Sequence, residues 1–106
     1  MMNRYPLSIF QYLSFIIHNL SLKKMKITVL TPDREVFQGD ITSVKVPGTG
    51  GQFQVLKNHA PVVSSLLKGE VTIAKTDGGK MKFTIEKGFI EVLNNEVSLL
   101  VQGVKE

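Results

Sequence analysis

Hydrophobic and polar residues alternate along most of the chain with the two-residue period of half-buried β-strands. In KMKFTIE, Met81, Phe83 and Ile85 are apolar, and the residues between them are lysine or threonine. KITVL at 26–30 and EVSLLV at 96–101 contain similar runs of apolar and β-branched residues. We therefore predict that these segments are strands, each with one face toward a hydrophobic core.

Turn signals separate the predicted strands. Asp77-Gly78-Gly79 stands between EVTIAK and KMKFTIE, and Asn94-Asn95 stands between FIEVL and EVSLLV, so both are predicted to be hairpin turns. Gly88 interrupts an otherwise continuous run and predicts a bulge or a bend. The spacing of these signals predicts about eight to ten short strands in an all-β sandwich or flattened barrel, with no helix of ordinary length after Met25.

The first 24 residues have a different pattern. Their apolar residues recur at helical spacing, at Ile9, Leu13, Ile16, Ile17 and Leu20. A membrane span is not predicted, because the apolar part contains polar residues and is shorter than the roughly 20 residues a span needs. A secretory signal fits poorly, because no small-residue cleavage site precedes Met25. We divide the chain into an extension, 1–24, which is either helical or not part of the native protein, and a β-domain, 25–106.

Composition and charge narrow the function classes. Ten of the 13 basic residues and all nine acidic residues lie from Met25 onward and are interspersed, so the β-domain has no basic field that would bind nucleic acid. The chain has no cysteine, which excludes disulfides and thiolate metal sites. With 106 residues, 42% of them hydrophobic, we expect one folded domain with one core.

Two short motifs are candidates for functional sites. PGTGG, Pro47 to Gly51, lacks the spacing of a phosphate-binding loop and is followed by no predicted helix, so we interpret it as a tight exposed loop with several positive φ angles. In NHAP, no acid or second histidine near His59 in the sequence could complete a metal site or a triad. We predict a turn in which Asn58 and His59 satisfy neighbouring backbone groups and Pro61 fixes the exit of the chain. No catalytic, cofactor-binding or metal-binding residue is predicted.

From Met25 to Glu106 these features occur in an order that resembles the N-terminal β-sandwich domain of the epsilon subunit of F-type ATP synthases. The segments that carry the resemblance are KITVLTPDREVFQGD, ITSVKVPGTGGQFQVLKNHAPVVSSLLKGEV and IEKGFIEVLNNEVSLLV. The second is the most specific, because it combines a glycine-rich loop, a hairpin and an NHAP turn. The resemblance implies a ten-stranded sandwich that is a non-catalytic rotor subunit, peripheral to the cytoplasmic face of the bacterial inner membrane.

The resemblance also implies two partners. In that family the domain packs beside the gamma subunit at the foot of the central stalk and rests on the ring of membrane c subunits. The residues expected on the ring side are Gly48, Thr49, Gly50, Gly51, Gln52, Asn58 and His59. One sheet face and the strand after the NHAP turn are expected to meet gamma, with Val63 and Ser64 in contact. His59 would then be a docking residue that fits and hydrogen-bonds.

The sequence departs from the family pattern in two places. The family usually has an acidic residue at the position of Gln52 and a glycine at that of Gln54, so we expect no ion pair from Gln52 to the ring. Many members continue into a C-terminal helical hairpin that inhibits ATP hydrolysis. The sequence stops after the last predicted strand, so we expect a short or truncated form for which helix-mediated inhibition is not claimed.

Two other classes remain as alternatives. A generic β-sandwich binding module would use PGTGG for recognition, but such modules display exposed aromatic residues. Here the β-domain contains no Trp or Tyr, and its phenylalanines occupy positions predicted to be buried, namely Phe37, Phe53, Phe83 and Phe89. A lipoyl-type swinging arm would need a lysine at a hairpin tip, and neither predicted tip has one. We keep the binding module as the alternative function.

Overall fold

The computed structural model describes residues 24–106, which form an all-β domain. Its eight strands are β1 (Met25–Leu30), β2 (Glu35–Gly48), β3 (Gly51–Leu56), β4 (Val62–Leu66), β5 (Gly69–Lys75), β6 (Lys80–Ile85), β7 (Lys87–Leu93) and β8 (Glu96–Gln102). The predicted all-β fold is confirmed, while the helical interpretation of the extension concerns residues outside the described part. No helix capable of crossing a membrane occurs within residues 24–106.

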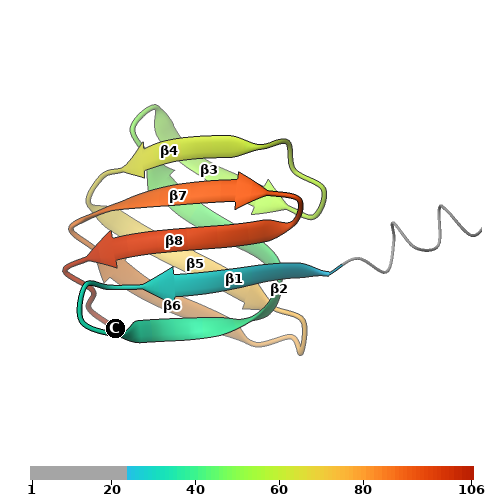
Figure 1. The fold of residues 1–106 in the computed structure, drawn as a ribbon. Helices are drawn as coiled ribbons and strands as arrows, with labels where there is room; N and C mark the ends of the chain where they lie inside the picture. The colour runs from blue at the N-terminus through green and yellow to red at the C-terminus, as the bar shows by residue number, and fades with distance from the viewer. Residues whose placement is uncertain (1–23) are drawn as a thin grey trace, which may run out of the picture.

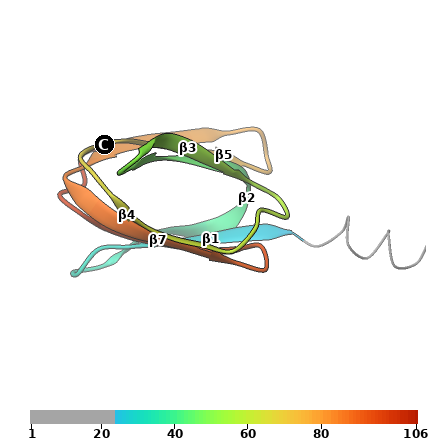
Figure 2. The ribbon, with the colours of Figure 1, turned by 90° about the horizontal axis from the view of Figure 1, so that it is seen from above.

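The strands form two layers that face each other (Figures 1 and 2). One layer has the order β4-β7-β8-β1, in which β1 runs parallel to β8. The other has the order β3-β2-β5-β6 and is antiparallel throughout. β2 is 14 residues long and serves both layers, because its first half pairs with β1 and its second half pairs with β3 and β5. This double use of β2 builds the sandwich from eight strands, where the resemblance implied ten.

The inward residues of both layers form one core. Ile27, Val44, Ile73, Ile85 and Leu99 come from five different strands and are fully buried. On β6 the predicted faces are confirmed, since the apolar residues point inward and the lysines and threonine between them are exposed. A shift of one residue would place the polar set in the core, so the alternation specifies the register of each strand.

Both predicted hairpin turns are confirmed. In the β5–β6 turn, Gly78 has a φ of 92°, and the Gly79 N–H donates to the carboxylate of Asp77 at 2.8 Å. In the β7–β8 turn, Asn94 and Asn95 have φ values of 51° and 65°. Two consecutive left-handed residues match the twist of the flanking strands, and asparagine is among the few residues that accept this conformation.

The prediction of several positive φ angles in PGTGG was wrong. Among the glycines of this motif only Gly51 has a positive φ, at 125°. Gly48 is required for a different reason, because a Cβ atom there would lie 2.7 Å from the ring of Phe53. The motif therefore combines one left-handed residue with one position at which an aromatic ring covers the backbone.

The bulge predicted at Gly88 is also not found in the structure. β7 pairs with β4 and β8 through Gly88 without a shift of register, and the bend lies at Glu86, where the chain leaves β6. Glycine is needed here because a Cβ atom would lie 2.8 Å from the carbonyl oxygen of Leu100 and 3.0 Å from Val101 Cγ1. Gly88 thus permits close packing of neighbouring strands.

Gly88→Ala should lower the free energy of unfolding by about 1–3 kcal/mol, because the added methyl group meets the Leu100 carbonyl oxygen, a backbone atom that cannot move freely. Gly50→Ala is the matched control, since a Cβ atom at Gly50 has no neighbour within 4 Å and φ is not positive there. We expect the control to change stability by less than about 0.5 kcal/mol. Urea unfolding curves measure both values, and equal midpoints for the two variants would contradict this account of Gly88.

Candidate interaction surfaces

The stretch from residue 46 to residue 67, whose exposed residues lie on one side of the domain, is almost free of charge, and we call it the β3–β4 edge. It includes β3, which is the end strand of one layer, and β4, which is the end strand of the other. Both strands lie at the top of Figure 1. Lys57 is its single Lys, Arg, Asp or Glu residue. A chain segment of this length on a protein surface usually carries several charges, so the composition favours contact with another surface over exposure to water.

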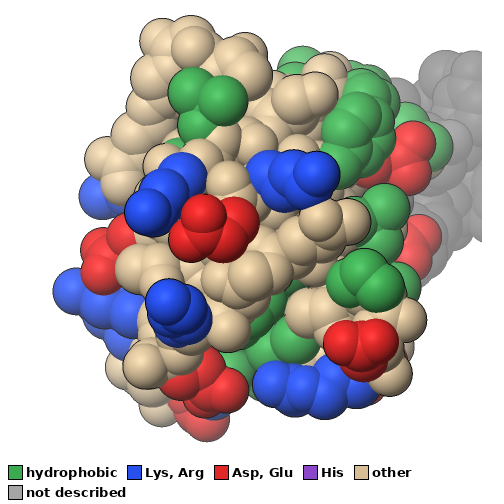
Figure 3. Space-filling model, turned by 90° about the vertical axis from the view of Figure 1, so that its left-hand side faces the viewer, with side chains coloured by type: hydrophobic (Ala, Val, Ile, Leu, Met, Phe, Trp, Pro, Cys, Tyr) green, Lys and Arg blue, Asp and Glu red, His purple; other side chains and the backbone are tan. Residues whose placement is uncertain are grey.

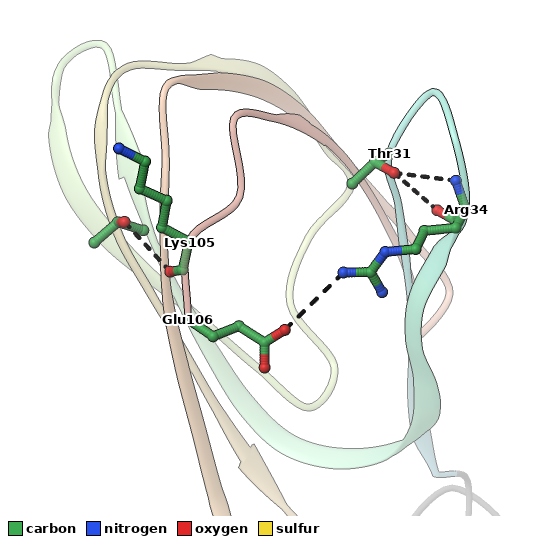
Figure 4. A network of polar contacts seen from close by, with 5 residues as sticks. Thr31, Arg34, Lys105 and Glu106 are labelled. Atoms are coloured by element: carbon green, nitrogen blue, oxygen red, sulfur yellow. Dashed lines mark hydrogen bonds and ion pairs between the residues drawn. The ribbon is translucent and has the colours of Figure 1, made fainter.

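The end of the sandwich viewed in Figure 3 has the opposite character, with charges of both signs. Lys68 lies 3.9 Å from Glu86, and Arg34 lies 4.0 Å from Glu106, in exposed ion pairs. Figure 4 shows that Thr31 holds the Arg34 loop, since its hydroxyl donates to the Arg34 carbonyl and accepts from the Arg34 N–H, both at 3.1 Å. Exposed ion pairs contribute only about 0–1 kcal/mol each. This end is an ordinary solvated surface.

The structure places the residues expected on the ring side at opposite ends of β3. Thr49 and Gly50 form the turn from β2 to β3, and Gly48, which pairs with Gly51, is buried under Phe53. Gln52 is exposed on β3, and Asn58 and His59 follow the other end of that strand. The two motifs therefore do not form one compact site. They lie at the two ends of a six-residue strand.

The NHAP turn is fastened to the β7–β8 turn by a pair of asparagines. The backbone N–H of Asn58 donates to Asn95 Oδ1 at 2.6 Å, and Asn95 Nδ2 donates to Asn58 Oδ1 at 3.0 Å. The Asn95 carbonyl also accepts from the Lys26 N–H at 2.9 Å. Asn95 is 4% exposed and is the buried polar residue of the part that the structure describes. Asn95 thus ties three chain segments together, with its side chain bonded to the NHAP turn and its backbone carbonyl bonded to the start of β1.

The hydrogen bonds of His59 agree with the predicted structural turn. Its N–H donates to the Leu56 carbonyl at 3.1 Å, and its Nδ1 lies 2.7 Å from the Ala60 carbonyl oxygen. A carbonyl oxygen only accepts, so Nδ1 carries a proton and donates, which leaves Nε2 for solvent or a partner. No group of His, Cys, Asp and Glu residues in 24–106 is arranged to hold a metal ion.

A second surface is apolar and lies on the outside of the β4-β7-β8-β1 layer. Leu30 pairs with Leu100, and Leu100 pairs with Phe89, so the three side chains form a row across three strands. They are 36%, 47% and 40% exposed, respectively. Val63 on β4 is 60% exposed on the same side of the layer. We call these four residues the apolar face.

The apolar face contains a hollow of about 430 Å³. It is lined by the Leu30–Leu100–Phe89 row and the start of the β1–β2 loop, and Lys87 and Gln102 contribute polar groups. Of the two residues expected on the gamma side, Val63 belongs to this face, whereas Ser64 points to the other side of β4 and its hydroxyl donates to the Ser65 carbonyl at 3.0 Å.

Phe89 is exposed, and its predicted burial was wrong. Ile90 and Val92 take the inward positions of β7, so the period of two turns Phe89 outward. The sequence contained this signal, because Ile90 and Val92 alternate with Glu91 in GFIEVL. The other phenylalanines of the β-domain are buried or packed against the core, as expected, namely Phe37, Phe53 and Phe83.

Comparison with known proteins identifies the family. Residues 24–106 match the family described as the beta-sandwich domain of the ATP synthase Delta/Epsilon chain. The chain belongs to this family. The match covers the whole part of the chain that the structure describes, so it includes the β3–β4 edge and the apolar face of this epsilon-type domain.

Curated relatives carry the same family name. The ATP synthase epsilon chain of Chlorobium limicola is 40% identical over 82 residues, which are 77% of this chain and 93% of that relative. The ATP synthase epsilon chain of Protochlamydia amoebophila (strain UWE25) is 39% identical over 79 residues, which are 74% of this chain and 54% of the relative. The epsilon-type domain thus spans nearly all of one relative and about half of the other.

A solved structure has the same fold. The cryo-EM structure of the central stalk and c-ring of the Tetrahymena thermophila mitochondrial ATP synthase contains a chain that matches with a TM-score of 0.71. The sequence identity is 18%, and the match covers 79% of this chain and 67% of that chain. At this identity the similarity establishes the fold of the epsilon-type domain and nothing further.

Asn95→Ala should destabilise the epsilon-type domain by about 1–3 kcal/mol more than Asn94→Ala, because it also removes two hydrogen bonds and leaves the Asn58 N–H without its partner. The comparison is matched, since both asparagines have left-handed backbone and Asn94 is exposed. Thermal or urea unfolding measures the difference. Equal destabilisation would show that the turn conformation, and not the asparagine pair, determines stability here.

Proposed function

We propose that this chain is a rotor subunit in the central stalk of a bacterial F-type ATP synthase. The single observation that carries the proposal is 40% identity to an ATP synthase epsilon chain over 93% of that relative's length. In this role the chain binds the gamma subunit and the c-ring and helps to couple proton-driven rotation to ATP synthesis. It has no active site of its own, and it is peripheral to the cytoplasmic face of the membrane.

The gamma subunit is the proposed partner of the apolar face. Leu30, Phe89 and Leu100 keep substantial apolar area in water in the isolated chain. Burial of such area against a partner contributes about 25 cal/mol per Å² before the costs of association. Val63 extends this surface onto β4, the strand that follows the NHAP turn. The hollow of about 430 Å³ in the row offers room for a side chain of gamma.

The c-ring is the proposed partner of the β3–β4 edge. Thr49, Gly50 and Gln52 at one end of β3 and His59 at the other can contact the ring together, because they lie along a single strand edge. These residues contain no Lys, Arg, Asp or Glu side chain, and their backbone and side-chain groups can form hydrogen bonds. The Asn58–Asn95 pair holds the histidine end in a fixed position.

The packing of the domain suits a part that transmits torque. The core is continuous between both layers and is formed by residues that are fully buried. Closely packed protein interiors have low compressibility, so a force applied at the β3–β4 edge should reach the apolar face with little deformation. The alternative of a generic binding module receives no support from the family match.

Leu100→Glu should prevent assembly, whereas Thr76→Glu should not. Both substitutions add one negative charge at an exposed position, but Thr76 lies in the β5–β6 turn, away from the apolar face. The measurement is co-purification of alpha, beta, gamma and c subunits with the tagged chain from mildly solubilised membranes. A loss of about 1.4 kcal/mol of binding free energy weakens the affinity about tenfold. We therefore expect the recovery of synthase subunits with Leu100→Glu to fall by about tenfold or more.

The parent chain is the internal control for this experiment. If no synthase subunit co-purifies with it under conditions that keep the complex intact, the rotor function is refuted and the binding-module alternative becomes the preferred one. If the parent assembles and Leu100→Glu assembles equally well, the rotor function stands, but the apolar face is not the gamma contact.

A further inference from the structure

The outer surface of β1, β8 and β7 has apolar residues at both of its ends. At one end lie the row of the apolar face and its hollow of about 430 Å³. At the other end is Leu93, which is 53% exposed and lies four residues along β7 from Phe89, a distance of about 13 Å. Midway between these ends, the small side chains of Thr28 and Ser98 lie side by side, and Glu91 continues their row. The surface is therefore low in the middle and apolar at both ends.

The chain enters the domain at the Leu93 end of this surface. The Lys26 N–H, at the start of β1, donates to the Asn95 carbonyl at 2.9 Å. Asn95 belongs to the β7–β8 turn, which comes directly after Leu93. From there β1 runs along the surface toward the row (Figure 1). Residues 1–23, which precede the described part of the chain, are thus attached beside one apolar end of an exposed surface.

The sequence of residues 7–20 predicts a helix that fits this surface. Its apolar stripe consists of residues at helical spacing, namely Ile9, Leu13, Ile16, Ile17 and Leu20. A helix rises 1.5 Å per residue, so the stripe from Ile9 to Leu20 is about 17 Å long, close to the length of the surface. Residues 21–24 can span about 13 Å, which is enough for the chain to reverse direction over the strands.

The charges also match. Residues 7–20 contain no Lys, Arg, Asp or Glu. The surface has charges of both signs in equal number, so it has no net charge that would favour a charged occupant. These outward residues are Lys26, Lys87, Glu91 and Glu96.

We propose that residues 7–20 dock as an amphipathic helix on the outer surface of β1, β8 and β7 and cover the apolar face in the free chain. Docking removes two apolar surfaces from water at once. The occupant belongs to the same chain, and a short tether gives it an effective concentration of the order of millimolar at the face. A second copy of the chain at micromolar concentration has no such advantage.

The contact itself is independent of the proposed function, but its consequence rests on that function. Gamma must displace the helix in order to reach the row. The apparent affinity of a partner falls by the fraction of time for which its site is open. A face that is open for about a tenth of the time therefore binds gamma about tenfold more weakly. The helix would keep the apolar face out of water until gamma is present.

Cysteine cross-linking of the full chain tests the contact, because the chain contains no cysteine of its own. Ile16→Cys places a thiol in the middle of the stripe, and Ser98→Cys places one in the middle of the surface. The matched control combines Ile16→Cys with Lys82→Cys, an exposed position on β6 in the other layer. With oxidised glutathione, we expect the Ile16–Ser98 variant to form its disulfide within one chain at least about tenfold faster than the control.

The possible results of the cross-linking are distinct. Equal rates in the two double variants overturn the proposal, and binding of the full chain to phosphatidylcholine vesicles would then assign the helix to lipid. A disulfide between two chains, seen as a dimer mass, means that a second copy covers the face and also overturns it. Urea unfolding of the reduced variants checks the fold. If Ser98→Cys unfolds the domain, Thr28→Cys provides the same test from β1.

A pair of charge variants in the full chain tests the consequence for gamma. Ile16→Glu and Gln11→Glu each add one negative charge, but position 11 lies on the side of the predicted helix opposite the stripe. Ile16→Glu should open the face and raise the affinity for the alpha–beta–gamma part of the synthase by about tenfold, and Gln11→Glu should match the parent. Isothermal titration calorimetry measures both affinities.

This second measurement separates the inference from the proposed function. If neither variant nor the parent binds, the proposed function fails, and the helix contact is decided by the cross-linking of the free chain. If all three bind with equal affinity, the rotor function stands, but the helix does not cover the face that gamma uses. Weaker binding by Ile16→Glu than by Gln11→Glu would overturn the covering role, because the stripe would then contact gamma itself.

Discussion

The register of β2 is the constraint on which the rest of the structure depends. β2 pairs with β1, β3 and β5 and touches β4 at Gly48, so it contributes to both layers. Val44 and Val46 on this strand are fully buried, and Lys45 between them is exposed. A shift of one residue would place the lysine in the core and the valines in water, and it would displace every strand that pairs with β2.

This register also determines the two surfaces. With Pro47 opposite Gln52, the polar groups of alternate β3 residues face away from β2, and the Leu67 N–H is satisfied at the same point where the chain leaves β4. The Pro47 ring lies 2.7 Å from where a Gly69 Cβ would be, so the crossing from β4 to β5 is tightly packed. In the other layer, the fixed position of β7 turns Phe89 outward beside Leu100. Surface and core therefore follow from one set of pairings.

The distribution of charge separates surfaces for contact from surfaces for solubility. Ion pairs and lysines occupy one end of the sandwich and the β6 edge. In contrast, Lys57 is the single Lys, Arg, Asp or Glu residue of the β3–β4 edge. The apolar face has a row of three large hydrophobic side chains. A small domain whose core is complete gains little from exposed apolar area, so such a row indicates a partner. Two chemically different surfaces on one rigid sandwich suit a subunit that links two neighbours.

The sequence determined the class of fold, the two asparagine and glycine hairpins, the inward face of β6 and the family resemblance, because these depend on local side-chain alternation and on the backbone conformations that single residues prefer. Tertiary structure decided the rest. The Asn58–Asn95 pair joins residues 37 positions apart, the separation of the two motifs to opposite ends of β3 depends on the β2–β3 register, and β3 is an end strand because β4 pairs with β7. Such features arise from the packing of distant segments, and a local pattern cannot specify which strands become neighbours.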